Sequence, residues 1–276
     1  MKITNHFLSG ENIKIEQTPN ISGEFASGLP DTLVMHYTGG SSAESSVRHL
    51  CKKSAKASAH LVIGRDGKIF QLAPFNVITW HAGRSSWKER NGLNKYSIGI
   101  ELDNAGELTD NGSGKFFSWF NKAYATEEVY SGIHRNRTSS SFWHSYTEEQ
   151  LEKTFDVCEL ISEHYNIKEI IGHEEIAPAR KSDPGPAFPL DRMREQILTE
   201  NRRSEEAENS PGESVQSIVN VSKLNIRKGP GVQYGMASEP LLNGAIVKPL
   251  KTNNGWTEVE YNVRGWVSSQ YIKPLV

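Results

Sequence analysis

The feature that most constrains the fold of this chain is a polar segment in its last third. Residues 199–217 read TENRRSEEAENSPGESVQS and contain almost no apolar side chains. Such a segment cannot bury enough apolar surface to fold, and its charges, Ser, Pro and Gly are typical of a solvated linker. The 276-residue chain is therefore predicted to form two domains, residues 1–198 and residues 218–276, joined by this linker.

The first predicted domain contains several strand patterns. The apolar run LVMH predicts a short strand that ends in His36, and AHLVIGRDGKIFQL predicts a hairpin around Asp66-Gly67. SIGIEL, residues 97–102, alternates, so Gly99 and Glu101 share the face opposite Ile98 and Ile100. IKEIIG predicts a strand that delivers His173 at its end.

Helical patterns alternate with these strands. Thr147 and Gln150 form a capping pattern before an apolar stripe, and Asn166 is placed to end that helix. A second stripe follows His36, with apolar residues at helical spacing: Val47, Leu50, Cys51 and Ala55. We therefore predict an α/β fold with a mixed central sheet, and we expect the functional site at the strand ends.

The second predicted domain, residues 218–276, shows no helical stripe. Short segments such as LNIR, AIVKPL, WTEVEY and GWVSS are separated by Gly-Pro-Gly, Asn-Gly and Asn-Asn-Gly turns. Short strands between such turns predict a small all-β barrel.

Composition argues against several classes of protein. The formal net charge is -2 and both signs are mixed along the chain, so nothing indicates a nucleic-acid or anionic-lipid partner. No stretch reaches the roughly 20 apolar residues of a membrane span, and the first twenty residues hold no continuous apolar segment. Cys51 and Cys158 form no paired motif and are predicted to be buried structural thiols. We expect a monomer, made in the cytoplasm without a signal peptide.

Three residues far apart in the sequence could bind one metal ion. A hydrolytic zinc site uses three nitrogen or carboxylate ligands and leaves one position open. His36, His173 and Asp183 would supply two neutral imidazoles and one carboxylate. Prolines around Asp183 favour extended geometry, so Lys181, two residues earlier, should project to the same side.

Two further residues could complete a hydrolytic site. The ammonium group of Lys181 would stabilise negative charge on a former carbonyl oxygen. Glu101, on the polar face of an apolar strand, is a candidate general base for the attacking water. Each residue also has a simpler explanation: a histidine packed at a strand end, an aspartate that starts a turn, a solvated lysine and an exposed strand glutamate. Spacing alone leaves these alternatives open.

Five separated motifs carry a family resemblance. LVMHYT, SAHLVIGRDGKIFQLAPFN, WHAG, SIGIEL and GHEEIAPARKSDPGPAF together resemble the type 2 N-acetylmuramoyl-L-alanine amidases, the AmpD-like or peptidoglycan-recognition-like zinc amidases. The resemblance spans about residues 30–195 in the family's order. It implies a central mixed sheet, one zinc ion per catalytic domain, and hydrolysis of the amide between the lactyl group of N-acetylmuramic acid and L-alanine.

The resemblance also assigns roles to individual residues. It implies His36, His173 and Asp183 as zinc ligands, Glu101 as general base and Lys181 as the transition-state lysine. Other branches of the family have cysteine at the position of Asp183, so the aspartate points to the AmpD-like branch. The candidates for the substrate pocket, each with packing as an equal alternative, are Tyr37, His60, Trp80 and His81.

This sequence departs from compact members of the family between Glu101 and His173. The extra residues, about 104–146, are rich in Phe, Trp and Tyr yet interrupted by Gly, Ser and Asn. That composition predicts an ordered loop excursion beside the site, which either shapes a glycan or peptide groove or caps exposed core.

The C-terminal residues resemble a bacterial SH3 domain, a module that usually binds cell-wall peptide. Trp256, Trp266 and Tyr271 are either binding or core residues, and we expect Trp266 in the core. A tethering module favours polymeric peptidoglycan or large fragments as substrate, because a second contact raises local concentration. The alternatives are a cytoplasmic amidase that recycles anhydro-muropeptides and a non-catalytic peptidoglycan-binding protein. Action on the wall would require lysis or a non-standard export route.

Overall fold

The computed structural model describes residues 1–112, 114–198, 217–221, 223–253 and 255–261. The chain divides into two compact units, Met1–Glu205 and Glu206–Val276. The predicted linker lies outside the described residues, apart from Ser217.

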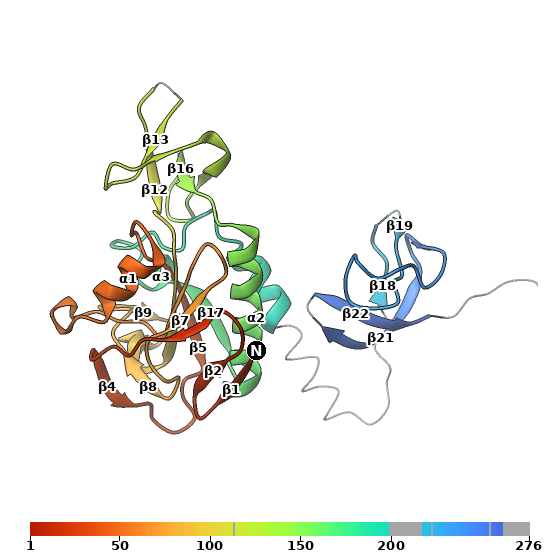
Figure 1. The fold of residues 1–276 in the computed structure, drawn as a ribbon, viewed down its shortest axis with the longest axis horizontal. Coiled ribbons are helices and arrows are strands. Elements are labelled where there is room, and N and C mark those ends of the chain that lie inside the picture. The colour runs from red at the N-terminus through yellow and green to blue at the C-terminus, as the bar shows by residue number, and fades with distance from the viewer. Residues whose placement is uncertain (113, 199–216, 222, 254, 262–276) are drawn as a thin grey trace, which may run out of the picture. The chain divides into compact units, whose positions relative to one another are not determined.

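The first unit is built around a six-stranded sheet with the order β17-β5-β11-β6-β7-β3. Its strands are β3 (Ile13–Ile15), β5 (Thr32–Tyr37), β6 (Leu61–Ile63), β7 (Ile69–Gln71), β11 (Ser97–Leu102) and β17 (Glu169–Gly172). Figure 1 labels β5, β7 and β17 of this sheet. β5 pairs in parallel with β11 and β17, and β11 pairs in parallel with β6. β6 and β7 form the antiparallel hairpin predicted around Asp66-Gly67. The predicted mixed central sheet is confirmed.

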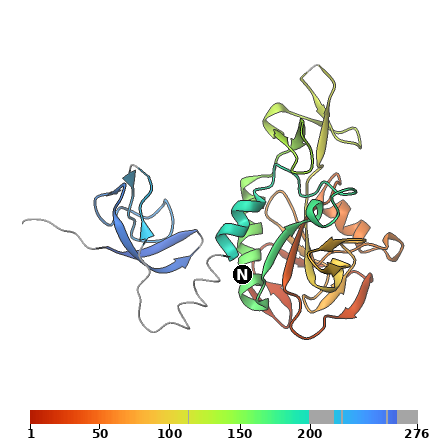
Figure 2. The same cartoon turned by 180° about the vertical axis from the view of Figure 1, so that it is seen from behind.

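Helix α2 (Glu148–Tyr165) covers one face of this sheet (Figures 1 and 2). The Thr147 side chain accepts a hydrogen bond from the Gln150 amide, and Asn166 ends the helix with φ 50°, as predicted. The Gln150 side chain instead donates to the Ile63 and Asp103 carbonyls. Apolar residues from the helix and the strands form the main core, among them Val157, Cys158, Ile161, Leu33, Met35, Ile98 and Ile100.

Helix α1 (Ala43–Leu50) packs on the other side of the sheet, where Ala43 and Val47 contact Val62 and Phe70. It is shorter than its apolar stripe predicts, because the chain leaves the helix at Cys51. The Cys51 thiol is half-buried and its Sγ lies 3.5 Å from the Glu16 carbonyl oxygen. None of the described helices is long and apolar enough to cross a membrane.

Shorter elements complete the first unit. The paired strands are β1 (Lys2–Thr4) with β2 (Phe7–Ser9), β4 (Ile21–Glu24) with β8 (Val77–Thr79), and β9 (Ser86–Trp87) with β10 (Arg90–Asn91). The short helices are η1 (Lys53–Ala55), η2 (Leu93–Lys95), η3 (Thr126–Glu128) and α3 (His173–Ile176). Residues 190–198 form a further helix, whose Met193 and Ile197 join the main core.

The segment between Glu101 and α2 forms a second sheet rather than a loop excursion. Its strand order is β14-β13-β12-β16-β15, and β12, β13 and β16 extend away from the central sheet in Figure 1. The strands are β12 (Glu107–Asp110), β13 (Phe116–Phe117), β14 (Ala123–Tyr124), β15 (Val129–Ile133) and β16 (Ser140–His144). Four aromatic residues of this segment belong to a small core of its own: Phe116, Phe120, Tyr124 and Phe142. The rings of Phe116 and Phe142 are tilted by 54°, with centroids 4.8 Å apart.

The second unit is all β in its described part, as predicted. Its strands are β18 (Ser217–Ile218), β19 (Lys223–Leu224), β20 (Leu241–Leu242), β21 (Ile246–Asn253) and β22 (Trp256–Glu260). Val219, Leu241 and Val247 form its core, and Trp256 is half-buried. Trp266 and Tyr271 lie outside the described residues.

Candidate metal centre

Three parallel strands carry the candidate residues to one edge of the central sheet. His36 lies near the end of β5, and Glu101 lies directly opposite it on β11. His173 follows β17 immediately as the first residue of α3. The carboxyl ends of parallel strands meet at one edge of a sheet, where open α/β folds place their sites.

The loop that carries Asp183 reaches the same edge because Gly172 has no side chain. A Cβ on Gly172 would lie 2.9 Å from Cδ of Pro184. The Glu174 amide also donates to the Asp183 carbonyl oxygen at 2.8 Å. The loop is therefore held against the start of α3.

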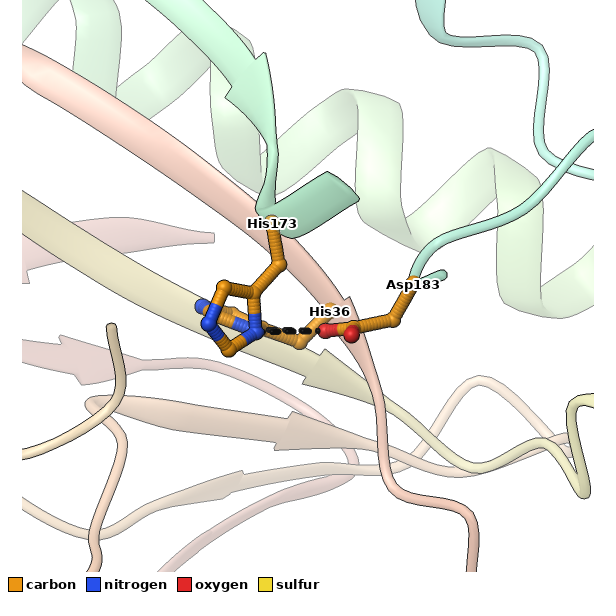
Figure 3. A group of neighbouring side chains, drawn as sticks. All are labelled: His36, His173 and Asp183. Atoms are coloured by element: carbon orange, nitrogen blue, oxygen red, sulfur yellow. Dashed lines mark hydrogen bonds and ion pairs between the residues drawn. The ribbon is translucent and has the colours of Figure 1, made fainter. Parts of the chain in front are cut away.

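Figure 3 shows that His36, His173 and Asp183 point toward a common centre. The Nδ1 atoms of the two histidines are 2.8 Å apart. Oδ2 of Asp183 lies 2.9 Å from Nδ1 of His36 and 2.8 Å from Nδ1 of His173. All three side chains are buried. The structure thus brings together, in one buried cluster, the three residues predicted to bind a metal ion.

The outer nitrogen of His173 shows that a cation fits this centre. Its Nε2 lies 3.1 Å from the Ala82 carbonyl oxygen, which can only accept, so Nε2 carries the ring proton. In the neutral ring, Nδ1 then carries no proton, and its lone pair faces the lone pairs of the Asp183 carboxylate. A proton can bridge only one pair of the three atoms, whereas a metal ion satisfies all three at once.

Burial is the largest influence on the pKa values of His36 and Asp183. It lowers the pKa of His36 to about 4, and His173 adds to this shift. Burial would raise the pKa of Asp183, but the contacts with His173 and His36 outweigh it and hold this pKa well below its ordinary value. A neutral imidazole and an ionised carboxylate are the states that bind metal ions.

Glu101 lies beside this centre with an unused acceptor atom. Its side chain is half-buried, and its buried Oε2 has no hydrogen-bond partner within the described part of the chain. Burial raises the pKa of Glu101 well above its ordinary value, the charge of Asp183 adds to this effect, and Lys181 opposes it. A bound cation would act in the same direction as Lys181 and favour the ionised carboxylate.

Lys181 is half-buried in the loop that follows α3, where its backbone N–H donates to the Ala177 carbonyl at 2.9 Å. No ion pair holds its ammonium group among the residues described. Its charge acts on the centre. Burial and nearer groups have larger effects on the pKa values of Glu101 and His36, and the charge of Lys181 lowers both.

Tyr37 and Trp80 keep part of their surface exposed. The Tyr37 hydroxyl lies 2.7 Å from Oγ of Ser182, and this contact joins β5 to the loop that carries Asp183. Burial raises the pKa of Tyr37 to about 12. Nε1 of Trp80 donates to Oγ of Ser22 at 2.6 Å. Substrate contact by these two side chains remains a prediction.

His60 and His81 are buried, and protein groups occupy their ring nitrogens. Nε2 of His60 donates to the Val77 carbonyl, and its Nδ1 accepts from the Gly99 amide at 3.0 Å. Nδ1 of His81 lies 3.0 Å from Nε2 of His36. These contacts support the packing alternative for His60 and place His81 behind a candidate ligand.

Residues 26–186, more than half of the chain, match the family model described as N-acetylmuramoyl-L-alanine amidase. The chain belongs to the N-acetylmuramoyl-L-alanine amidase family. Residues 222–273 match the model of a bacterial SH3 domain. The family resemblance and the fold class predicted from the sequence are confirmed.

Several amidases are similar to this chain. It is 32% identical over 173 residues to the N-acetylmuramoyl-L-alanine amidase AmiD of Escherichia coli K12, which covers 59% of this chain and 52% of the relative. It is 33% identical over 141 residues to the 1,6-anhydro-N-acetylmuramyl-L-alanine amidase AmpD of the same organism, covering 50% and 57%. The chain thus spans about half the length of the curated relatives it matches.

Two solved amidase structures are also similar. A crystal structure of an AmpD derivative has 26% identity and a TM-score of 0.46, and the match covers 70% of this chain and 98% of that one. A complex of E. coli AmiD with anhydro-N-acetylmuramic acid-L-Ala-D-γ-Glu-L-Lys has 27% identity and a TM-score of 0.47, covering 67% and 66%.

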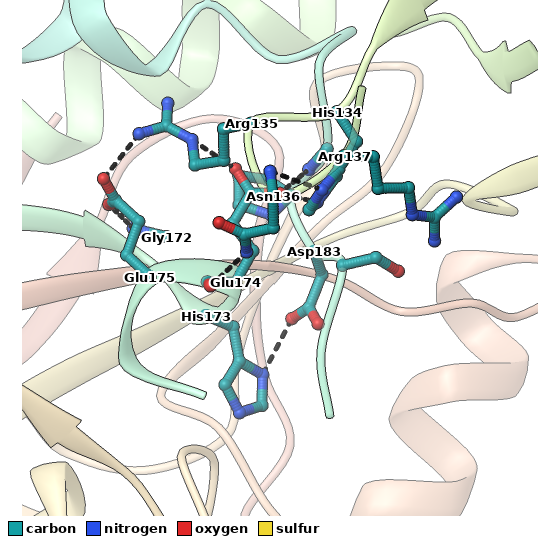
Figure 4. Close-up of polar contacts among 12 residues, drawn as sticks. His134, Arg135, Asn136, Arg137, Gly172, His173, Glu174, Glu175 and Asp183 are labelled. Carbon is teal, nitrogen blue, oxygen red and sulfur yellow. Dashed lines mark hydrogen bonds and ion pairs between the residues drawn. The ribbon is translucent and has the colours of Figure 1, made fainter. Parts of the chain in front are cut away.

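In this amidase-family chain the second sheet is tied to the candidate metal centre through Glu174 (Figure 4). The buried Glu174 carboxylate lies 2.5 Å from Nε2 of His134 and 2.9 Å from Nε of Arg135. The Asn136 side chain donates to the Glu174 carbonyl at 2.8 Å. Burial raises the pKa of Glu174 to about 7, although Arg135 opposes this.

Sequence reasoning assigned no role to Glu174, although it is the residue after His173 in the motif GHEE. A second acidic residue directly after a candidate ligand was the available signal. Its partners come from a segment about 40 residues earlier, which no local pattern connects to it.

Proposed function

We propose that this chain is a zinc-dependent N-acetylmuramoyl-L-alanine amidase. It hydrolyses the amide between the lactyl group of N-acetylmuramic acid and L-alanine of the peptidoglycan stem peptide. Its family supports the reaction, and the two histidines and one carboxylate that converge within one buried cluster support the metal. The convergence of His36, His173 and Asp183 is the observation that carries the proposal.

The protein residues around the ion have separate roles. A zinc ion held by His36, His173 and Asp183 would act as a Lewis acid that polarises the amide carbonyl and acidifies water. Glu101 accepts the proton of the attacking water at Oε2, its unpaired acceptor, and returns it to the amino group that leaves on L-alanine. The Lys181 ammonium stabilises the negative charge that develops on the carbonyl oxygen.

The substrate is polymeric peptidoglycan or a large fragment of it. The second unit matches a bacterial SH3 domain, and a second contact with the same polymer raises the local concentration of the scissile bond. Small soluble fragments offer no such second contact. Several relatives are named 1,6-anhydro-N-acetylmuramyl-L-alanine amidases. A soluble anhydro-muropeptide is therefore the substrate to compare with polymeric peptidoglycan.

The test uses intact sacculi and defined soluble muropeptides, with and without the 1,6-anhydro sugar. Mass spectrometry should show a free L-alanine amino terminus and a free lactyl carboxylate as the two products. Cleavage at any other bond, or none, would overturn the proposed reaction. Faster turnover of anhydro-muropeptides than of sacculi would overturn the proposed substrate and leave the reaction intact.

The contribution of the second unit is tested with residues 1–205, the compact first unit. Its rate on sacculi should fall relative to the full chain, while its rate on a soluble muropeptide stays unchanged. The soluble substrate is the internal control for correct folding. Equal rates on sacculi for both chains would remove the tethering role.

A further inference from the structure

The His81 side chain lies directly behind the candidate ligand His36. His81 is 8% exposed, and its Nδ1 lies 3.0 Å from Nε2 of His36, on the far side of the ring from the metal centre. The two rings meet edge to face, with centroids 5.1 Å apart. Metal-bound histidines usually donate their outer N–H to a carboxylate, a carbonyl or water. Here the partner is a second imidazole, which can accept or donate.

The other nitrogen of His81 decides which of these it does. Nε2 of His81 lies 3.2 Å from the Ser97 carbonyl oxygen and 3.3 Å from the Ser97 hydroxyl. The hydroxyl donates its own proton to the Leu93 carbonyl at 2.6 Å, so toward His81 it can only accept. Nε2 of His81 faces two acceptors and must therefore carry the proton.

The proton positions then follow along the chain of contacts. With its proton on Nε2, neutral His81 has a lone pair at Nδ1, and this lone pair accepts the Nε2 proton of His36. His36 is left with a lone pair at Nδ1, the atom that faces His173 and Asp183. If His81 donated from Nδ1, the His36 proton would move to Nδ1 and block the metal position.

We propose that His81 is a positioning residue that fixes the tautomer of His36 and thereby keeps its Nδ1 free for the metal ion. This inference rests on the proposed function, since it assumes that the centre binds zinc. His81 contacts Nε2 of His36, whereas the metal position lies at Nδ1 of that ring.

Two neighbouring residues, Gly99 and Asn94, hold His81 in this position. A Cβ on Gly99 would lie 2.3 Å from Cγ of His81, so only glycine at this position of β11 leaves room for the ring. The Asn94 side-chain oxygen accepts hydrogen bonds from the His81 amide at 3.1 Å and the Ala82 amide at 2.7 Å. The Ala82 carbonyl in turn accepts from Nε2 of His173. One short segment, His81–Ala82, thus contacts the outer nitrogens of both histidine ligands.

The alternative is that His81 only fills space. A matched pair of variants separates the two. Asn places an amide oxygen close to the position of Nδ1, whereas Leu has a similar size and no acceptor. The dissociation constant for zinc of the full chain is measured by competition with a chromogenic chelator at fixed pH. The control is His60→Leu, since His60 is also buried and its ring centroid lies 6.1 Å from that of His81. In the described structure the ring nitrogens of His60 contact Val77, Thr79 and Gly99 rather than a candidate ligand.

We expect His81→Leu to weaken zinc binding by about 10- to 100-fold, the usual effect of losing such a partner. His81→Asn should restore most of the loss, and His60→Leu should leave zinc affinity within about threefold of the original. Equal zinc affinity in the Leu and Asn variants, or equal weakening by His60→Leu, overturns the inference. Absence of zinc binding by the unmodified chain would instead overturn the proposed function.

A second measurement needs no substitution, so it tests the inference even if the His81→Leu variant fails to fold. Long-range ¹H–¹⁵N spectra of the zinc-loaded chain with ¹⁵N-labelled histidine report which ring nitrogen carries the proton. We expect the proton on Nε2 in both His36 and His81. A proton on Nδ1 of His81 overturns the inference.

Discussion

Glu101 and His36 lie directly opposite each other on the parallel strands β11 and β5. In a parallel pair, opposite residues project from the same face. The candidate base is therefore placed beside a candidate ligand by the register of the sheet. Several expected outcomes depend on this relationship.

Replacing Glu101 by Gln should separate catalysis from metal binding. The variant keeps the size of the side chain but removes the proton acceptor, so turnover should fall at least about 100-fold. Zinc content, measured by elemental analysis, should be unchanged. Glu44→Gln, which removes an exposed carboxylate on α1, is the control and should be fully active. Wild-type turnover of Glu101→Gln would remove this residue from the mechanism.

Asp183→Ala should lose both zinc and activity, because the side chain supplies one of three ligand atoms. Zinc affinity is measured by competition with a chelator. Asp191→Ala, which changes an exposed carboxylate after the same loop, is the matched control. Stoichiometric zinc of unchanged affinity in Asp183→Ala would contradict the assigned ligand set.

Glu174→Ala should release the second sheet from the metal centre. The change removes the buried carboxylate that lies against His134 and Arg135. Arg135 is partly exposed and keeps Glu175 as a partner, so the free energy of unfolding should fall by about 2 kcal/mol, the usual cost of leaving a buried polar group such as the His134 ring unpaired. Hydrogen exchange of residues 129–144 should become faster. Glu169→Ala, which removes the ion pair with Lys88 at the start of β17, should leave exchange in this segment unchanged. Unaltered exchange in Glu174→Ala would show that the sheet is held by other contacts.

His60 should make stability depend on pH. Burial lowers its pKa from 6.5 to about 4, so between these values the unfolded chain binds a proton that the folded chain does not. The contribution of neutral His60 to the free energy of unfolding is therefore fully present above pH 6.5 and is lost as the pH falls toward 4. Between pH 7 and pH 5 this loss is about 2 kcal/mol.

Urea unfolding at both pH values, with chelator present to exclude metal binding, measures this effect. His60→Gln should show a smaller loss between pH 7 and pH 5 than the unmodified chain. The same loss in both would contradict a buried neutral His60.

The three candidate ligands could be named from the sequence because the family resemblance implies them, and because each residue also ends a recognisable strand or lies next to prolines. His36 ends an apolar run, His173 follows IKEIIG, and Asp183 precedes a proline. These local signals define where the chain must turn. They also indicate polar groups at the same sheet edge.

The surroundings of the ligands could not be predicted in the same way. From the sequence, His81 is a candidate for the substrate pocket, and nothing in WHAG indicates that its ring lies over Gly99 and behind His36. The second sheet was expected as a loop, since strands as short as Phe116–Phe117 are too brief to show alternation. Both features depend on packing between segments distant in the sequence.

The most direct test of the account is the metal requirement of hydrolysis by the full chain. Chelator-treated protein should release no L-alanine amino termini from purified peptidoglycan. Activity should return in proportion to added zinc and reach its plateau at one equivalent per chain. Undiminished release from protein shown to be free of metal would contradict the proposal that His36, His173 and Asp183 form a catalytic metal centre.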